Sequence, residues 1–312
     1  MTSNLLVVLP IFALILTGWG ARRLRVMGPT AVSEINRFVV YLALPALLFD
    51  IMANADPKDL WQPGFIIAFA AGCLFVFILT VLLRRRKGAH LADAAIDGLN
   101  ASYANTGFMG FPLLLAVVGS AAMSATLIAT IVTVCVLFAI AMVLIESSLQ
   151  AGASRRAVAW RTFLSLARNP LLLAPAAGFI VMLAGFQLPS AFDKYLKLLG
   201  AAASPCALIA LGLFLADKSG STSSAHRRSE AVLAALKLVA QPAVTWVIAF
   251  PVLGLPQAMA QTAVLLAALP TGTGPFMLTE YYSRDGLLTA RTILTTTVLS
   301  IVTLSAYLAL SE

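Results

Sequence analysis

Long apolar stretches separated by short polar segments constrain the fold of this chain more than any other feature. A transmembrane helix needs about 20 mostly apolar residues. Ten stretches approach or exceed that length, at about 4–22, 33–53, 62–83, 92–118, 122–146, 169–187, 196–216, 231–252, 258–281 and 288–309. Soluble domains are about 25% charged, whereas only 11% of these residues are charged and 60% are hydrophobic. We therefore predict an all-α membrane protein with ten transmembrane helices.

The basic residues predict how these helices are oriented. If the N-terminus lies outside and the chain crosses at every stretch, 18 of the 21 Lys and Arg residues fall on one side. Only Lys58, Lys194 and Lys197 fall on the other side. Cytoplasmic loops carry the excess of Lys and Arg in membrane proteins. The sequence thus predicts a multi-pass protein of the bacterial cytoplasmic (inner) membrane with both termini on the periplasmic or extracellular side.

Motifs for catalysis, cofactors and metals are missing from the sequence. HExxH, GxSxG and GxxxxGK[ST] are absent, so we expect neither an enzyme nor a bound cofactor. The three cysteines lie far apart without a CxxC pair, which argues against a metal site. No basic stretch alternates with stacking aromatic residues, as nucleic-acid binding would require. The expected partners are a small solute and membrane lipid.

Short motifs recur in the same order in the two halves of the chain. Pro10 corresponds to Pro175, LALPALLFD to ASPCALIALG, Gln62-Pro63 to Gln241-Pro242, and TGFMGFP to PTGTGPF, with offsets of about 160–180 residues. Five crossings per half give the halves opposite orientations, as in many secondary transporters. We therefore expect two inverted five-helix repeats, at 1–150 and 169–312, joined by a cytoplasmic linker at 151–168.

The fourth and ninth stretches contain the residues that most strongly interrupt a helix. Proline removes a backbone donor and clashes with the preceding turn, and glycine lets another backbone approach closely. The residues expected to break and cross these helices are Gly107, Gly110, Pro112, Pro270 and Gly272. Breaks at matching places in two inverted halves predict a binding site between the repeats. Exposed helix N-termini in such a site favour an anion.

Four polar side chains next to the breaks are the candidate binding residues. Asn105, Thr106, Thr271 and Thr273 have groups that can bond to carboxylate oxygens. They can equally cap the broken helices by bonding to the backbone. The sequence leaves both interpretations open.

Two ionisable residues lie inside the predicted helices. Lys237, about two turns into the eighth stretch, either extends its ammonium group to the membrane interface or binds an acidic substrate. Asp97 lies early in the fourth stretch, near enough to its end to be wet, and is the candidate for coupling to a proton or cation.

The motifs together resemble those of the auxin efflux carrier family, in the bile acid/auxin transporter superfamily, over nearly the whole chain. They are LALPALLF at 42–49, NTGFMGFPLL at 105–114, LGAAASPCALIALGLFLA at 199–216, KLVAQP at 237–242 and ALPTGTGPFMLTEYY at 268–282. The resemblance implies two inverted five-helix repeats whose helices 4 and 9 cross at Pro112 and Pro270. It also matches Asn105 and Lys237 to an asparagine and a lysine of the family pattern.

The leading hypothesis is a secondary transporter of small organic anions that works by alternating access at the helix crossing. Bacterial members of the resembling family include malonate- and malate-type carriers, so mono- or dicarboxylates are the expected substrates. Uptake of an anion against an inside-negative membrane potential would need a coupled proton or Na⁺, whereas efflux could run passively. A homodimer is an expectation from the resemblance alone. A ligand-gated channel or a membrane ligand sensor is the alternative, and the missing catalytic motifs disfavour an intramembrane enzyme.

Overall fold

A computed structural model describes residues 2–149, 160, 164, 167–217 and 224–311. All regular elements in these ranges are helices, so the all-α prediction is confirmed for them. They are α1 Thr2–Arg23, α2 Ala31–Phe38, η1 Val39–Ala43, α3 Leu44–Ala53, α4 Pro57–Leu60, α5 Pro63–Arg86, α6 Leu91–Ser102, η2 Thr106–Gly110, α7 Phe111–Val117, η3 Ser120–Ala122, α8 Met123–Thr130, η4 Ile131–Leu137, α9 Phe138–Leu149, α11 Pro170–Leu183, α12 Ser190–Ala201, α13 Ala203–Asp217, α14 Ser224–Ala235, η5 Leu236–Ala240, α15 Gln241–Val247, η6 Ile248–Val252, α16 Gln257–Ala267, α17 Gly274–Tyr281 and α18 Leu287–Ser311.

Six continuous helices in the described ranges are long and apolar enough to cross a membrane. They cover Ala31–Ala53, Pro63–Arg86, Ser120–Leu149, Ser190–Asp217, His226–Val252 and Leu287–Ala309. Three further apolar helices are shorter, at Thr106–Val117, Pro170–Leu183 and Gln257–Ala267. The chain is therefore a multi-pass helical membrane protein, and the ten-helix inverted repeat stays a prediction. Of the expected linker at 151–168, only residues 160, 164, 167 and 168 are described.

Proline explains several wide turns inside the long helices. The π-helical turns η1, η2 and η5 each end two residues before a proline, namely Pro45, Pro112 and Pro242. Proline cannot donate a backbone hydrogen bond, and its ring clashes with the carbonyl four residues earlier. That carbonyl lies within the π-helical turn in all three cases. The wider turn relieves the clash without ending the helix.

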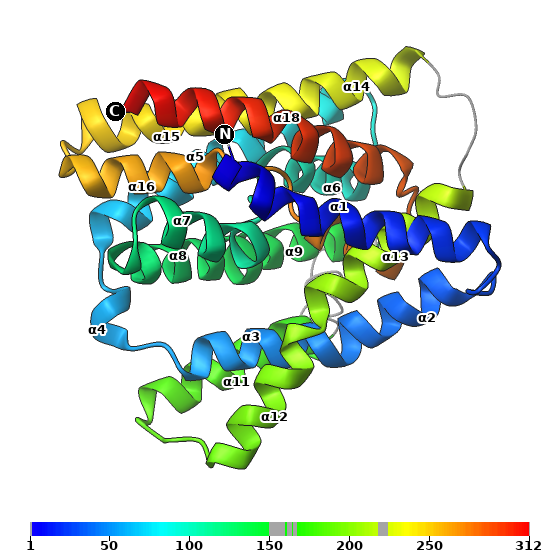
Figure 1. The fold of residues 1–312 in the computed structure, drawn as a ribbon, viewed down its shortest axis with the longest axis horizontal. Coiled ribbons are helices and arrows are strands. Elements are labelled where there is room, and N and C mark those ends of the chain that lie inside the picture. Colours follow the sequence, from blue (N-terminus) through cyan, green and yellow to red (C-terminus); the bar gives the residue numbers. More distant parts are fainter. Residues whose placement is uncertain (1, 150–159, 161–163, 165–166, 218–223, 312) are drawn as a thin grey trace.

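The helices pack as two groups (Figure 1). In the first group, α1 packs along α13, and α3 packs along α11 and α12. In the second group, α5 packs against α6 and α15, α6 against α9, and α14 against α18. Contacts between the groups are sparser and include α1 with α7 and α18, and α2 with α17. The crossing region described below belongs to the second group and faces the first.

Two glycines allow the closest approach within the first group. A Cβ atom on Gly18 of α1 would overlap the Ile209 carbonyl oxygen of α13. A Cβ atom on Gly212 of α13 would overlap the Ile15 carbonyl oxygen of α1. The two backbones can therefore touch only because both positions lack a side chain. Small residues at helix interfaces are a common means of association in membranes, where apolar surface gives little driving force.

Ion pairs gather at one end of the bundle, which we call the basic end. It holds the pairs Arg22–Asp217 at 2.6 Å, Arg84–Asp97 at 2.5 Å, Arg284–Asp93 at 2.5 Å and Arg291–Glu230 at 2.7 Å. Three of these pairs connect helices or loops of the second group, and Arg22–Asp217 connects α1 with α13. These arginines are among the residues that the sequence analysis assigns to the cytoplasmic side.

We predict that Gly212→Ala lowers the free energy of unfolding in detergent by about 1–3 kcal/mol, because overpacking forces the two backbones apart. Gly20→Ala is the matched control, since no atom lies within 4 Å of the position that its Cβ would take and alanine favours a helix. Equilibrium unfolding of both variants checks the prediction. Equal stability of Gly212→Ala and the parent chain would contradict it.

Candidate functional site

Two interrupted helices meet in the middle of the second group. Residues 103–105 separate α6 from η2, and residues 268–273 separate α16 from α17. Ala104 and Thr271 form an antiparallel β-bridge. The Asn105 N–H donates to the Pro270 carbonyl at 2.9 Å, and the Gly272 N–H donates to the Tyr103 carbonyl at 3.0 Å. We call these two segments the crossing.

The C-terminal ends of the two leading half-helices bind side chains from one neighbouring helix. The Lys237 ammonium group donates to the Ala267 carbonyl of α16 at 2.8 Å. The Gln241 amide donates to the Ser102 carbonyl of α6 at 3.0 Å. Both side chains are fully buried and lie one turn apart. A cation at a helix C-terminus is favourable because the carbonyls there carry partial negative charge. Lys237 therefore binds backbone inside the bundle and does not extend to the interface.

The polar groups of Thr271 also form hydrogen bonds within the protein. Its hydroxyl donates to the Asn100 carbonyl of α6 at 2.7 Å, and its N–H donates to the Thr296 hydroxyl of α18 at 3.2 Å. The Asn100 amide in turn donates to the Thr289 hydroxyl of α18 at 2.9 Å. Thr271 thus joins α6, α18 and the crossing, and it does not line the cavity described next.

The N-terminal ends of the trailing half-helices face a cavity of about 70 Å³. Asn105 and Thr273 line it from the crossing, Thr106 lines it from the start of η2, and Leu47 and Ser204 line it from the first group. A single water needs about 10–15 Å³ of such volume, so several water-sized groups fit. The cavity therefore lies where the two groups of helices meet.

Polar groups around this cavity lack partners within the described structure. Asn105 and Thr273 each precede a helix, but neither side chain makes a capping hydrogen bond. The Thr106 side chain is fully buried, and its hydroxyl oxygen has no hydrogen-bond partner. Buried polar atoms in native proteins nearly always have a partner. Asn105 and Thr273 thus do not cap the helices that follow them.

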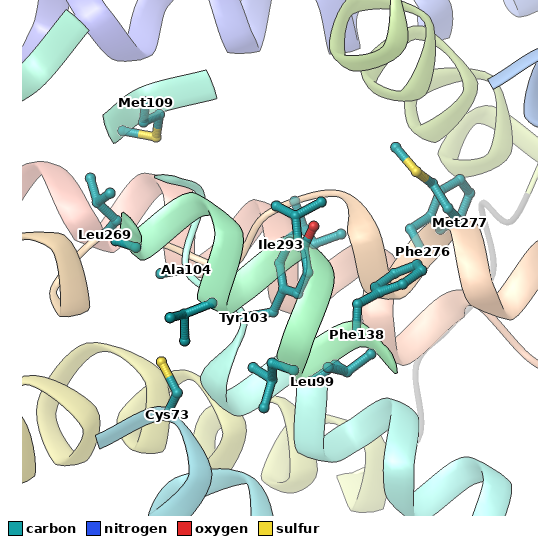
Figure 2. Packing of buried hydrophobic residues seen from close by; sticks show 14 of the residues in the cluster. Cys73, Leu99, Tyr103, Ala104, Met109, Phe138, Leu269, Phe276, Met277 and Ile293 are labelled. Atoms are coloured by element: carbon teal, nitrogen blue, oxygen red, sulfur yellow. The ribbon is translucent and has the colours of Figure 1, made fainter. Parts of the chain in front are cut away.

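Tyr103 packs against Gly272 of the crossing and against Gly274, the first residue of α17. A Cβ atom on Gly272 would lie 2.9 Å from the Tyr103 ring, and one on Gly274 would lie 2.5 Å from it. The ring also lies 6.1 Å from that of Phe138. Figure 2 shows Tyr103 and Ala104 among buried side chains of α5, α6, α9 and α17, including Cys73, Leu99, Phe138 and Phe276. Glycine at 272 and 274 therefore makes room for the tyrosine ring.

The remaining predicted break residues take different places. Pro270 contributes its carbonyl to the crossing, whereas Pro112 lies in the first turn of α7, eight residues after Ala104. Gly107 and Gly110 lie in η2 beside α8, where added Cβ atoms would lie 3.7 Å from Thr130 and 3.3 Å from Thr126. The backbones therefore cross at Ala104 and Thr271, and Pro112 is not part of the bridge.

Asp97 lies at the basic end, away from the cavity at the crossing. Its carboxylate accepts a 2.5 Å hydrogen bond from the Arg84 guanidinium group of α5. Only 4% of Asp97 is exposed, and it lines a cavity of about 300 Å³ at the basic end together with Arg84 and Asp93. Asp97 precedes Ala104 of the crossing by about two helical turns of chain.

A larger cavity of about 470 Å³ lies near the beginning of α2, lined by Asn36, Arg37, Val40 and Glu146, among others. Asn36, Val40, Leu44 and Leu47 follow one another at spacings of four, four and three residues, which places them on one helix face. Leu44 and Leu47 line the cavity at the crossing. The Asn36 amide donates to the Met277 carbonyl of α17 at 3.5 Å, and Met277 also lines the cavity at the crossing. This contact therefore lies between the two cavities.

Comparison with known proteins identifies the family. The profile of the family described as "Membrane transport protein" matches residues 5–308. The chain belongs to this family, which includes the auxin efflux carriers. The resemblance inferred from the sequence motifs is thereby confirmed.

Individual relatives cover most of the chain. A "Putative malonate transporter" of Rhizobium meliloti is 31% identical over 96% of this chain and 93% of its own length. "Auxin efflux carrier component 8" of Arabidopsis thaliana is 26% identical over 84% of each chain. The "Uncharacterized transporter YfdV" of Escherichia coli K12 is 27% identical over 67% of each chain. The family and these relatives are transporters and not enzymes.

Sequence reasoning missed two residues that the structure brings to this region. Gln241 was a marker of the internal repeat, but its amide binds the end of α6. Ser204 lines the cavity from α13, beside Pro205 of a repeat motif. Both residues directly precede a proline inside an apolar stretch, and this shared pattern is the signal that could have identified them.

We predict that Gln241→Met lowers the free energy of unfolding by about 1–3 kcal/mol, because it leaves the buried Ser102 carbonyl without its donor. Gln257→Met, at an exposed position at the start of α16, is the control and should change stability little. Equilibrium unfolding in detergent distinguishes the two. A Gln241→Met variant as stable as the parent would show that this hydrogen bond is dispensable.

Proposed function

We propose that this protein is a secondary transporter of small organic anions, with mono- or dicarboxylates such as malonate or malate as substrates. The observation that carries the proposal is the cavity at the crossing, which Asn105 and Thr106 line beside two helix N-termini. The Thr106 hydroxyl is buried there without a hydrogen-bond partner among the described residues. Helix N-termini present N–H donors and a partial positive charge, which suits a carboxylate. The name of the Rhizobium relative supports malonate as a substrate within this class.

Asn105, Thr106 and Thr273 are the proposed substrate-binding residues. Lys237 and Thr271 hold the backbone of the crossing in place by the hydrogen bonds described above, so we assign them positioning roles. The Lys237 charge lies next to the end of α16 and adds positive potential to the region through which an anion passes. Specific binding then comes from the side chains and N–H groups that line the cavity.

Transport proceeds by alternating access in this proposal. The two helix groups meet at the cavity, and the sparser contacts between them favour movement of one group against the other. Paired breaks in the α6–α7 and α16–α17 segments are what two inverted five-helix repeats, 1–150 and 169–312, would produce. The Asn36–Met277 contact then closes the path from the basic end and must open for the substrate to pass.

Orientation and coupling complete the proposal. The basic end faces the cytoplasm by the distribution of Lys and Arg, which puts both termini outside a bacterial inner membrane. Moving an anion inward against the membrane potential costs about 2.3 kcal/mol per charge per 100 mV. Uptake therefore needs a coupled proton or Na⁺, for which Asp97 is the proposed group, whereas efflux does not. A homodimer is proposed on the family resemblance alone.

We predict that Asn105→Ala and Thr106→Val weaken malonate binding by about 10- to 100-fold each, the usual effect of losing a hydrogen bond to a charged group. Thr106→Val should leave the unliganded protein at least as stable, because the hydroxyl that it removes has no partner. Thermal shift with malonate measures both effects, since a ligand of the native state raises apparent stability.

Thr245→Val is the matched control for this experiment. The Thr245 hydroxyl is also buried without a partner, but Thr245 does not line the cavity. This variant should keep the malonate-induced shift of the parent. Equal shifts for Thr106→Val, Asn105→Ala and the control would remove both residues from the binding site.

We also predict saturable malonate flux with counterflow in proteoliposomes that contain the purified protein. An alternating-access carrier exchanges labelled for unlabelled substrate across the membrane, whereas a channel shows no counterflow. Flux without counterflow would favour a ligand-gated channel, and malonate binding without any flux would favour a membrane sensor. Proteoliposomes with Asn105→Ala protein serve as the control for flux that does not use the site.

A further inference from the structure

An apolar groove with a basic rim lies between α5 and α14, outside the cavity at the crossing. It has a volume of about 670 Å³. Leu83 of α5 and Val232 of α14 line its walls and are 38% and 43% exposed. Leu233 and Leu236 continue the wall toward the middle of the bundle. The α5 and α14 segments belong to helices that span the membrane by length and composition, so this exposed apolar surface faces lipid.

Basic side chains gather at one end of the groove. Arg84 and Lys87 come from the last turn of α5 and the residue after it, and Arg228 comes from the first half of α14. Arg84 is held by Asp97 and contacts the Ser229 hydroxyl at 3.5 Å. Among the described residues, Lys87 and Arg228 form no ion pair with a carboxylate, and no acidic residue lines the groove. The rim therefore carries uncompensated positive charge.

The spacing of residues along the α14–η5 segment places basic and apolar side chains on the same helix face. Arg228, Val232 and Leu236 follow at intervals of four residues, so they share one face of the α14–η5 segment. From Arg228 to Leu236 the helix rises about 12 Å. The charged rim lies at the basic end, at the depth of lipid headgroups, and the apolar wall extends from it toward the membrane centre. This is the order of groups in a phospholipid molecule.

We propose that this groove binds one anionic phospholipid, with its phosphate at Lys87 and Arg228 and an acyl chain along Val232 and Leu236. Basic pockets between transmembrane helices on the cytoplasmic side are suited to such headgroups. A free phosphate or carboxylate would use the rim but leave the apolar wall uncovered. A zwitterionic lipid would cover the wall but bring its own positive charge to the rim. An anionic lipid satisfies both parts of the groove.

The test compares retention of dioleoylphosphatidylglycerol and dioleoylphosphatidylcholine by the purified protein, measured by native mass spectrometry. We expect preferential retention of phosphatidylglycerol. Lys87→Gln with Arg228→Gln should weaken it about 25-fold, because the loss of about five-fold for each basic residue near the membrane surface multiplies. Val232→Trp, which fills the groove and keeps both charges, should also reduce retention. All three positions are exposed, so the variants keep the packed interior intact.

Arg86→Gln with Arg227→Gln is the matched control, because it removes two exposed charges from the same helix ends without touching the groove. It should leave retention unchanged. Equal retention of the two lipids, or an equal loss in the control pair, would overturn the proposal. So would displacement of the lipid by excess inorganic phosphate, which would indicate a site for a free anion. Loss of a dimer in Val232→Trp without a change in lipid retention would assign the groove to a second copy of the chain and would also overturn it.

Discussion

The need to satisfy backbone polar groups inside the membrane governs this structure. An interrupted helix leaves N–H and C=O groups without intrahelical partners, and in hydrocarbon each unpaired group costs several kcal/mol. Here two interruptions lie side by side, and each provides one backbone N–H donor and one carbonyl acceptor for the other. Asn105 and Gly272 donate backbone N–H groups across the crossing to Pro270 and Tyr103. Neither break would be stable alone, so the pairing of α6–α7 with α16–α17 holds the second group together.

The C-terminal and N-terminal helix ends at the crossing have different surroundings. The carbonyl ends of α6 and α16 bind fixed donors, Gln241 and Lys237, which lie one turn apart on the helix that continues into α15. The N-terminal ends of η2 and α17 face a cavity that Asn105, Thr106 and Thr273 line. Under the proposed function this asymmetry separates stability from binding, because the fixed donors hold the breaks open and the N-terminal side receives the solute. It is also the physical basis for expecting an anion there.

The division of the helices into two groups gives the cavity its position. The first group is tied together by the direct contact of α1 and α13 at Gly18 and Gly212, and the second by the crossing and the ion pairs of the basic end. The cavity takes Leu47 and Ser204 from the first group and its polar residues from the second. A site that lies between two separately packed groups can be exposed by moving one of them. The groove between α5 and α14 lies outside this cavity and is lined by other residues.

Much of the architecture follows from the order of residues alone. Apolar length and scarce charge required membrane helices, and the Pro and Gly residues at 270–275 marked the second interruption. The first interruption lies at 103–105, just before the Gly and Pro cluster at 107–112. The sequence also selected Asn105, Thr106 and Thr273 as candidates, because they are polar residues beside these glycines and prolines. It could not separate these from Thr271 and Lys237, since a polar residue near a break can bind either solute or backbone.

Only the tertiary structure decided which of these roles each side chain takes. Lys237 and Thr271 bind carbonyls of helices that are distant in the chain, and no local pattern encodes that contact. The crossing falls at Ala104 and not at Pro112, because the extended residues 103–105 provide the free N–H and C=O groups that pair, whereas Pro112 continues a helix. Local composition determines where a helix must break, and packing between distant segments determines which groups remain open to a ligand.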